Sequence, residues 1–160
     1  QRYSTSRSYF IEKPLSNIDI LNWVKQLKLE HFRRIYSRDN LPKKIRQECG
    51  IINLDTQLGP GTHWVCYRNI DKNCEYFDSF GLPMAKEILE YLETSGKQIF
   101  YSTDEIQERN SVLCGYWCLY YLMERQKGIS MLDTIHNPGF DPVNHSINHK
   151  FIIQYFKKIY

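Results

Sequence analysis

Four polar residues of this chain have side chains that can carry out acyl transfer, and they follow one another as His63, Asp78, Gln107 and Cys114. A thiol is a weak nucleophile at its ordinary pKa of about 8.5, so it needs an imidazole to take its proton and a carboxylate to orient the imidazole. A hydrogen-bond donor must also face the oxyanion that forms on the attacked carbonyl. The four residue types together predict the chemistry of a cysteine protease.

Cys114 stands at the start of the strongest helical pattern in the chain, residues 113–126, in which apolar side chains occupy nearly every side. A helix that is apolar all round is buried. At its first residue the helix dipole and the unpaired backbone amides stabilise a thiolate. A buried structural cysteine is the alternative interpretation, and it suits Cys118, one turn further on. Gly115 favours a nucleophile at Cys114, because a small residue here lets a substrate approach the backbone.

His63 and Asp78 are expected on neighbouring strands. A turn at 71–73 separates the apolar runs 62–67 and 74–77, which is the pattern of a β-hairpin. Antiparallel pairing brings the start of the first run close to the end of the second, so Asp78 can accept a proton from the ring of His63 and fix its tautomer. A packed histidine and a turn residue are the alternative interpretations of these two positions.

Gln107 lies seven residues before Cys114. Its side-chain amide would complete an oxyanion hole together with the backbone amide of Cys114. A surface glutamine is the alternative interpretation when the other three residues are left aside.

The remaining cysteines and histidines do not have the spacing of a metal site. The five cysteines are an odd number without a CxxC pair, which favours free thiols in a reducing, intracellular compartment over disulfides or structural zinc. His145 and His149 are four residues apart, as zinc ligands on a helix are, but no cysteine or carboxylate completes the set. We therefore expect no metal and no cofactor.

The bulk properties fit a single domain over residues 1–160, with 42% hydrophobic residues to build its core. Residues 1–15 are expected to form a loose N-terminal arm. The net charge of +3 is mild and the basic residues are dispersed, which favours a solvated surface over one that binds a polyanion. No apolar run reaches the ~18 residues that cross a membrane. We expect a monomer.

Hydrophobic periodicity predicts a chain that contains both helices and strands. Ser16 and Asp19 have the spacing of a helix N-terminus and precede apolar residues at helical intervals up to residue 27. Further helices are expected at 31–36, 88–92, 113–126 and 147–160, and strands at 49–54, 62–67, 74–77 and 98–101.

The four residues His63, Asp78, Gln107 and Cys114, in this order, resemble the pattern of the adenovirus-type cysteine proteases. The wider clan of these enzymes includes the SUMO-specific proteases. The run Cys49-Gly50-Ile51-Ile52-Asn53 and the later Thr62-His63-Trp64 are similar to an adenoviral segment, and residues 76–81 are similar to the strand that carries the orienting carboxylate. The seven-residue step from Gln107 to Cys114 follows the adenoviral version rather than the six-residue SUMO-type version. The similarity covers residues 49–126.

The resemblance implies an α+β, papain-like fold of the adenain type, in which a central, mainly antiparallel sheet is flanked by helices. The nucleophile would lie at the N-terminus of a buried helix. It implies a thiol endopeptidase that cleaves capsid or polyprotein precursors at sites containing glycine. Its gene would belong to a virus or to a virus-like DNA transposon of the Polinton/Maverick type, and it would act in the host nucleus or cytoplasm and inside virus particles. The implied roles are nucleophile for Cys114, general base and acid for His63, orienting carboxylate for Asp78 and oxyanion donor for Gln107, with Asn53, Trp64 and Gly115 lining the substrate cleft.

Two features of adenoviral enzymes concern their activation. They are activated by a peptide disulfide-linked to a cysteine upstream of the oxyanion glutamine, but this chain has no cysteine between Cys74 and Cys114. They also use DNA as a cofactor, for which the net charge of +3 is only weak support. A peptide or DNA activator is thus implied by analogy alone. Two alternative functions stay open: an isopeptidase for a ubiquitin-like modifier, and an inactive capsid-associated binding module.

Overall fold

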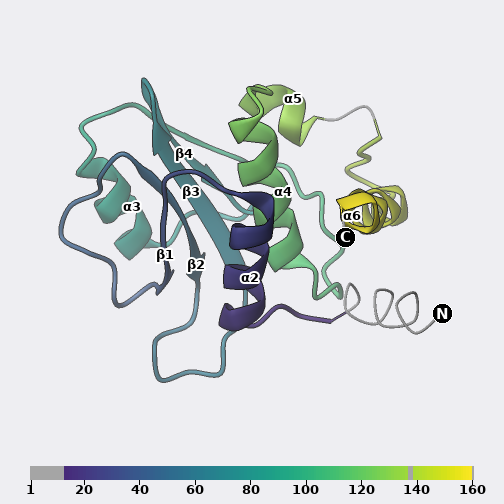
Figure 1. Cartoon of the computed structure of the whole chain (residues 1–160), viewed down its shortest axis with the longest axis horizontal. Helices are drawn as coiled ribbons and strands as arrows, with labels where there is room; N and C mark the ends of the chain where they lie inside the picture. The colour runs from purple at the N-terminus through teal and green to yellow at the C-terminus, as the bar shows by residue number, and fades with distance from the viewer. Residues whose placement is uncertain (1–12, 137–138, 160) are drawn as a thin grey trace.

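The computed structural model of the protein describes residues 13–136 and 139–159. These residues form a five-stranded sheet with helices on both faces (Figure 1). The elements in chain order are α2 (Asn17–Leu27), β1 (Phe32–Ser37), β2 (Glu48–Asn53), β3 (Trp64–Ile70), β4 (Asn73–Phe77), α3 (Lys86–Glu93), β5 (Ile99–Tyr101), α4 (Cys114–Gln126), α5 (Met131–Ile135) and α6 (His145–Ile159). The predicted α+β fold is confirmed.

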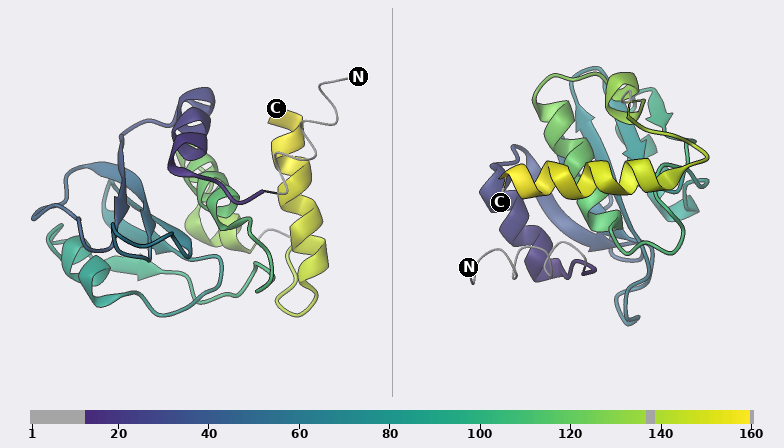
Figure 2. Two further views of the ribbon diagram at one scale, coloured as in Figure 1. Left: turned by 90° about the horizontal axis from the view of Figure 1, so that it is seen from below. Right: turned by 90° about the vertical axis from the view of Figure 1, so that its right-hand side faces the viewer.

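Helix α4 occupies the centre of the helical layer. Helix α3 covers one face of the sheet, whereas α2 and α4 cover the other (Figure 1). Helix α6 packs on the side of α4 that faces away from the sheet (Figure 2). Residues 114–122 of α4 are all buried, which explains why apolar side chains occur on every side of this helix.

The strands lie in the order β1-β2-β3-β4-β5. The central pairs β2–β3 and β3–β4 are antiparallel, as predicted, but β1 and β5 are each parallel to their neighbour, so the sheet as a whole is mixed. In the β3–β4 hairpin Cys66 pairs with Phe77. His63, just before β3, and Asp78, just after β4, therefore lie at the same end of the hairpin, as the sequence predicts.

Several local predictions are confirmed. Ser16 caps α2 in a capping box with Asp19, and the strands and helices expected near β2, β4, β5, α3, α4 and α6 are present. Within the described residues, no helix is both long enough and apolar enough to cross a membrane.

Three predictions need correction or addition. The helix expected at 31–36 is wrong, because Phe32–Ser37 forms strand β1 and pairs in parallel with β2. The short helix α5, capped by Ser130, was not expected. Residues 1–12 of the expected N-terminal arm lie outside the described residues. Leu15, at the end of that arm, is buried with 5% exposure rather than loosely held.

Candidate active site

His63 and Asp78 form a buried hydrogen-bonded pair. Nε2 of His63 lies 2.6 Å from Oδ1 of Asp78, and the Asp78 side chain is almost wholly buried. The carboxylate also accepts hydrogen bonds from the backbone amides of Phe80, at 2.9 Å, and Leu82, at 3.3 Å. These donors hold the carboxylate in the one orientation that meets the imidazole.

Cys114 completes the group as the first residue of α4. Its Sγ accepts a hydrogen bond from the backbone amide of Trp64 at 3.4 Å. Burial acts to lower the pKa of His63, but the hydrogen bond to Asp78 and the interaction with Cys114 outweigh it and raise the pKa to about 9. Because Asp78 takes Nε2, the ring atom left for the thiol is Nδ1. The structure thus brings Cys114, His63 and Asp78 together.

Phe80, which is not among the predicted site residues, covers one face of His63. The two rings are stacked with their centres 4.3 Å apart, and the guanidinium of Arg109 lies 5.7 Å from the centre of the Phe80 ring. The residue follows the Asp78-Ser79 turn, but nothing in its local sequence indicates this contact.

Gln107 is held between two segments of the chain. The hydroxyl of Ser79 donates to Oε1 of Gln107, and Nε2 of Gln107 donates to the carbonyl of Ser111 at 2.9 Å. Gln107 itself is buried and is not part of the cleft wall, whereas Ser111 is. The side-chain amide nitrogen of Gln107 carries two hydrogens, and the Ser111 carbonyl accepts one of them.

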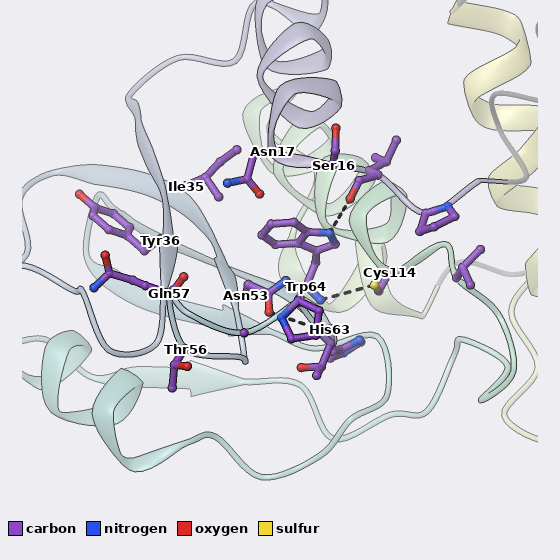
Figure 3. Close-up of a pocket in the computed structure, with 18 of the residues that line it drawn as sticks. Ser16, Asn17, Ile35, Tyr36, Asn53, Thr56, Gln57, His63, Trp64 and Cys114 are labelled. Carbon is purple, nitrogen blue, oxygen red and sulfur yellow. Dashed lines mark hydrogen bonds between the residues drawn. The ribbon is translucent and has the colours of Figure 1, made fainter.

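His63 and Cys114 open into a cleft of about 820 Å³. Figure 3 shows that the labelled residues around the cleft come from the start of α2, from β1, from the end of β2 and the loop that follows it, and from the first residues of β3 and α4. Asn53 and Trp64, both predicted to contact substrate, line it. Asn53 also braces the loop, because its Oδ1 accepts from the amides of Asp55 at 2.9 Å and Thr62 at 3.2 Å.

Trp64 joins the N-terminal segment to the nucleophile. Its Nε1 donates to the carbonyl of Leu15 at 3.0 Å, a contact drawn in Figure 3, while its own backbone amide donates to Cys114. Residues Pro14 to Ile18 line the cleft beside it. The sequence predicted the aromatic wall, but not that Leu15 supports it.

Gly115 has a different role from the one predicted. It is buried and does not line the cleft. A Cβ atom added at Gly115 would lie 3.1 Å from Cδ1 of Leu15 and 3.3 Å from Cδ1 of Trp64. Glycine here permits close packing of the N-terminal segment and Trp64 on α4, and a direct approach of substrate to Gly115 is not part of this arrangement.

The other candidate ligands do not gather into a metal site. In the described part of the chain, no three His, Cys, Asp or Glu side chains lie together as metal ligands would. All five cysteines are free and buried. His145 is engaged with the carbonyl of Pro142.

An α+β fold with a thiol, an imidazole and a carboxylate at one cleft is the architecture of papain-like cysteine proteases. Solved structures similar to this chain include the crystal structure of the ASFV pS273R protease, with a TM-score of 0.60, 14% sequence identity, and coverage of 89% of this chain and 67% of that one. The Se-Met form of that protease matches with a TM-score of 0.57 and the same identity and coverage. No protein-family profile and no curated protein matches the sequence. The likeness establishes the fold.

Proposed function

We propose that this protein is a cysteine endopeptidase with Cys114 as nucleophile, His63 as general base and acid, Asp78 as orienting carboxylate and Gln107 as oxyanion donor. The observation that carries the proposal is the position of His63. Its ring lies between a buried carboxylate 2.6 Å away and the first residue of a buried helix, at the wall of an open cleft. The likeness of the fold to the ASFV protease supports it.

The mechanism follows from this arrangement. The Cys114 thiolate attacks the scissile carbonyl carbon, and the negative charge moves to the carbonyl oxygen, where Gln107 and the Cys114 amide stabilise it. The C–N bond then breaks as the imidazolium of His63 gives its proton to the leaving amine. Water, deprotonated by His63, attacks the thioester and releases the acid and the thiol.

We propose precursors of virus-like capsids or polyproteins as substrates, cleaved at sites with glycine near the scissile bond. The wall formed by Trp64 beside Cys114 favours small residues there, because a bulky side chain would meet the indole. The sequence motifs shared with adenovirus-type proteases support the same class of substrate.

The proposal is tested by incubating the protein and its Cys114→Ala variant with a proteome-derived peptide library. Cleavage by the wild type alone, at sites that share a motif, is the expected result. Equal cleavage by both proteins would remove Cys114 from the mechanism, provided that both melt at the same temperature. If neither cleaves, the protein is better described as a binding module.

The isopeptidase alternative is separated by a second reagent. A ubiquitin-like modifier with a C-terminal electrophile labels Cys114 only if the cleft accepts that modifier. The seven-residue step from Gln107 to Cys114 argues against it, so we expect labelling by short peptide electrophiles but not by the modifier.

A further inference from the structure

Ser79 contacts Gln107 through both its backbone and its side chain. The carbonyl of Ser79 accepts hydrogen bonds from the backbone amides of Ile106 and Gln107, each at 3.0 Å, and its hydroxyl donates to Oε1 of the Gln107 side chain. Both side chains are almost wholly buried, Ser79 at 0% and Gln107 at 1% exposure. These hydrogen bonds hold Ile106 and Gln107, in the segment that precedes Cys114, against Ser79.

The hydrogen bonds leave one orientation for the amide group of Gln107. The carbonyl of Ser111 can only accept, so it requires Nε2 on its side. Oε1 then faces Ser79, whose hydroxyl supplies the donor that a buried oxygen needs. A flipped amide would bring Oε1 against the Ser111 carbonyl, where two acceptors repel each other.

We propose that Ser79 is a positioning residue of the oxyanion hole, acting through Gln107. This inference rests on the proposed function, because it assumes that Gln107 stabilises an oxyanion. Asp78 orients His63, and the next residue fixes Gln107, so the turn after β4 sets both the base and the oxyanion donor. Without the Ser79 hydroxyl the Gln107 amide loses the partner of its oxygen, and its second N–H is no longer held in one direction.

The experiment separates oxyanion stabilisation from thiolate formation. Hydrolysis of a peptide substrate requires both, whereas alkylation of Cys114 by chloroacetamide forms no oxyanion and requires only the thiolate. For Ser79→Ala we expect kcat to fall about 10- to 100-fold with KM little changed, while the rate and pH profile of Cys114 alkylation stay as in the wild type. Ser79→Cys fills the same space with a weaker hydrogen-bond donor, so its kcat should lie between those of the wild type and Ser79→Ala.

Double and control variants sharpen the result. Because Ser79 acts through Gln107, the double variant Ser79→Ala/Gln107→Ala should be no slower than Gln107→Ala alone. Thr134→Val is the matched control: it also removes a buried hydroxyl, one that donates to the Ser130 carbonyl at 2.8 Å in α5. Its kcat should equal that of the wild type after melting temperatures are compared.

The outcomes distinguish this inference from the function on which it rests. If the wild type cleaves and Ser79→Ala keeps full kcat, or if the two variants multiply their effects, Ser79 does not position Gln107. If Ser79→Ala lowers alkylation and kcat equally, it acts on the fold or on the thiolate instead, and the inference is again wrong. If the wild type cleaves no peptide, the proposed function itself fails.

Discussion

The imidazole ring of His63 is stacked on the phenyl ring of Phe80, with their planes only 9° apart. The Phe80 amide also donates to the same Asp78 oxygen that meets His63. One residue thus holds the carboxylate with its backbone and covers the imidazole with its side chain.

Replacing Phe80 should therefore slow the reaction. Aromatic pairs contribute ~0.5–1.5 kcal/mol beyond the area they bury, so we expect Phe80→Ala to lower kcat/KM about tenfold, while Phe80→Tyr keeps most of it. Peptide hydrolysis measures the effect. Phe100→Ala, which removes a half-exposed ring from β5, is the control. An equal loss in the control would mean that any aromatic truncation has this effect.

The raised pKa of His63 predicts how stability depends on pH. Burial lowers this pKa, but Asp78 and Cys114 raise it to about 9, above the value of about 6.5 expected in the unfolded chain. The imidazolium therefore stabilises the fold fully below about pH 6.5 and loses this contribution as the pH rises through about 9. Asp78→Asn should cost more unfolding free energy at about pH 6 than at about pH 10, measured by urea unfolding. An equal cost at both pH values would contradict the assignment.

The same pair should also set the alkaline limit of the proposed peptidase activity. The imidazolium that donates to the leaving amine is lost as the pH passes about 9, so kcat/KM should fall on that side. In Asp78→Asn this fall should begin at lower pH, because the carboxylate that favours the imidazolium is gone. Initial rates measured across the pH range check this shift. If kcat/KM falls at the same alkaline pH in both proteins, a group other than His63 titrates there.

Thiol reactivity should single out Cys114. Burial raises the pKa of Cys49 to about 12 and of Cys74 to about 11, and it raises the pKa of Cys118 well above the ordinary value. Chloroacetamide at neutral pH should therefore modify Cys114 at least about 100-fold faster than these three, as followed by mass spectrometry of the peptides. In denaturant the difference should vanish. If Cys118 reacts as fast in the folded protein, Cys114 is not an activated thiol.

Gly115 offers a test of the N-terminal contact. A methyl group at this position would crowd Leu15 and Trp64, so Gly115→Ala should destabilise the protein by about 1–3 kcal/mol and lower activity. The double variant Leu15→Ala/Gly115→Ala should lose less stability than the sum of the two single variants, because the smaller side chain at position 15 makes room for the added methyl group. Thermal melting and hydrolysis measure both quantities. Additive losses would place the strain elsewhere.

The parts of the fold that local signals specify were predicted well. The capping box of Ser16 and Asp19 marks the start of α2, and the turn at 71–73 defines the β3–β4 hairpin. The β3–β4 hairpin by itself places His63 and Asp78 at the same end of two paired strands, so their proximity could be predicted from the sequence.

Contacts between distant segments explain what was missed. The helix expected at 31–36 is instead strand β1, because parallel pairing with β2 stabilises it and no local pattern encodes that partner. Ser79, Phe80 and Leu15 act on the site only through residues remote in sequence or through a stacked ring. Single side chains of this kind carry no motif, so only the folded arrangement reveals them.

The order of strands in the sheet follows the order of the chain, and α4 comes after all of them. Each strand pairs with the strand that precedes it in the chain, so the sheet can assemble as the chain lengthens during synthesis. His63, Asp78 and Gln107 leave the ribosome before Cys114 does. A nascent chain can therefore hold a formed hairpin before α4 is complete, and under the proposed function hydrolysis would start only when α4 docks on a sheet that is already in place.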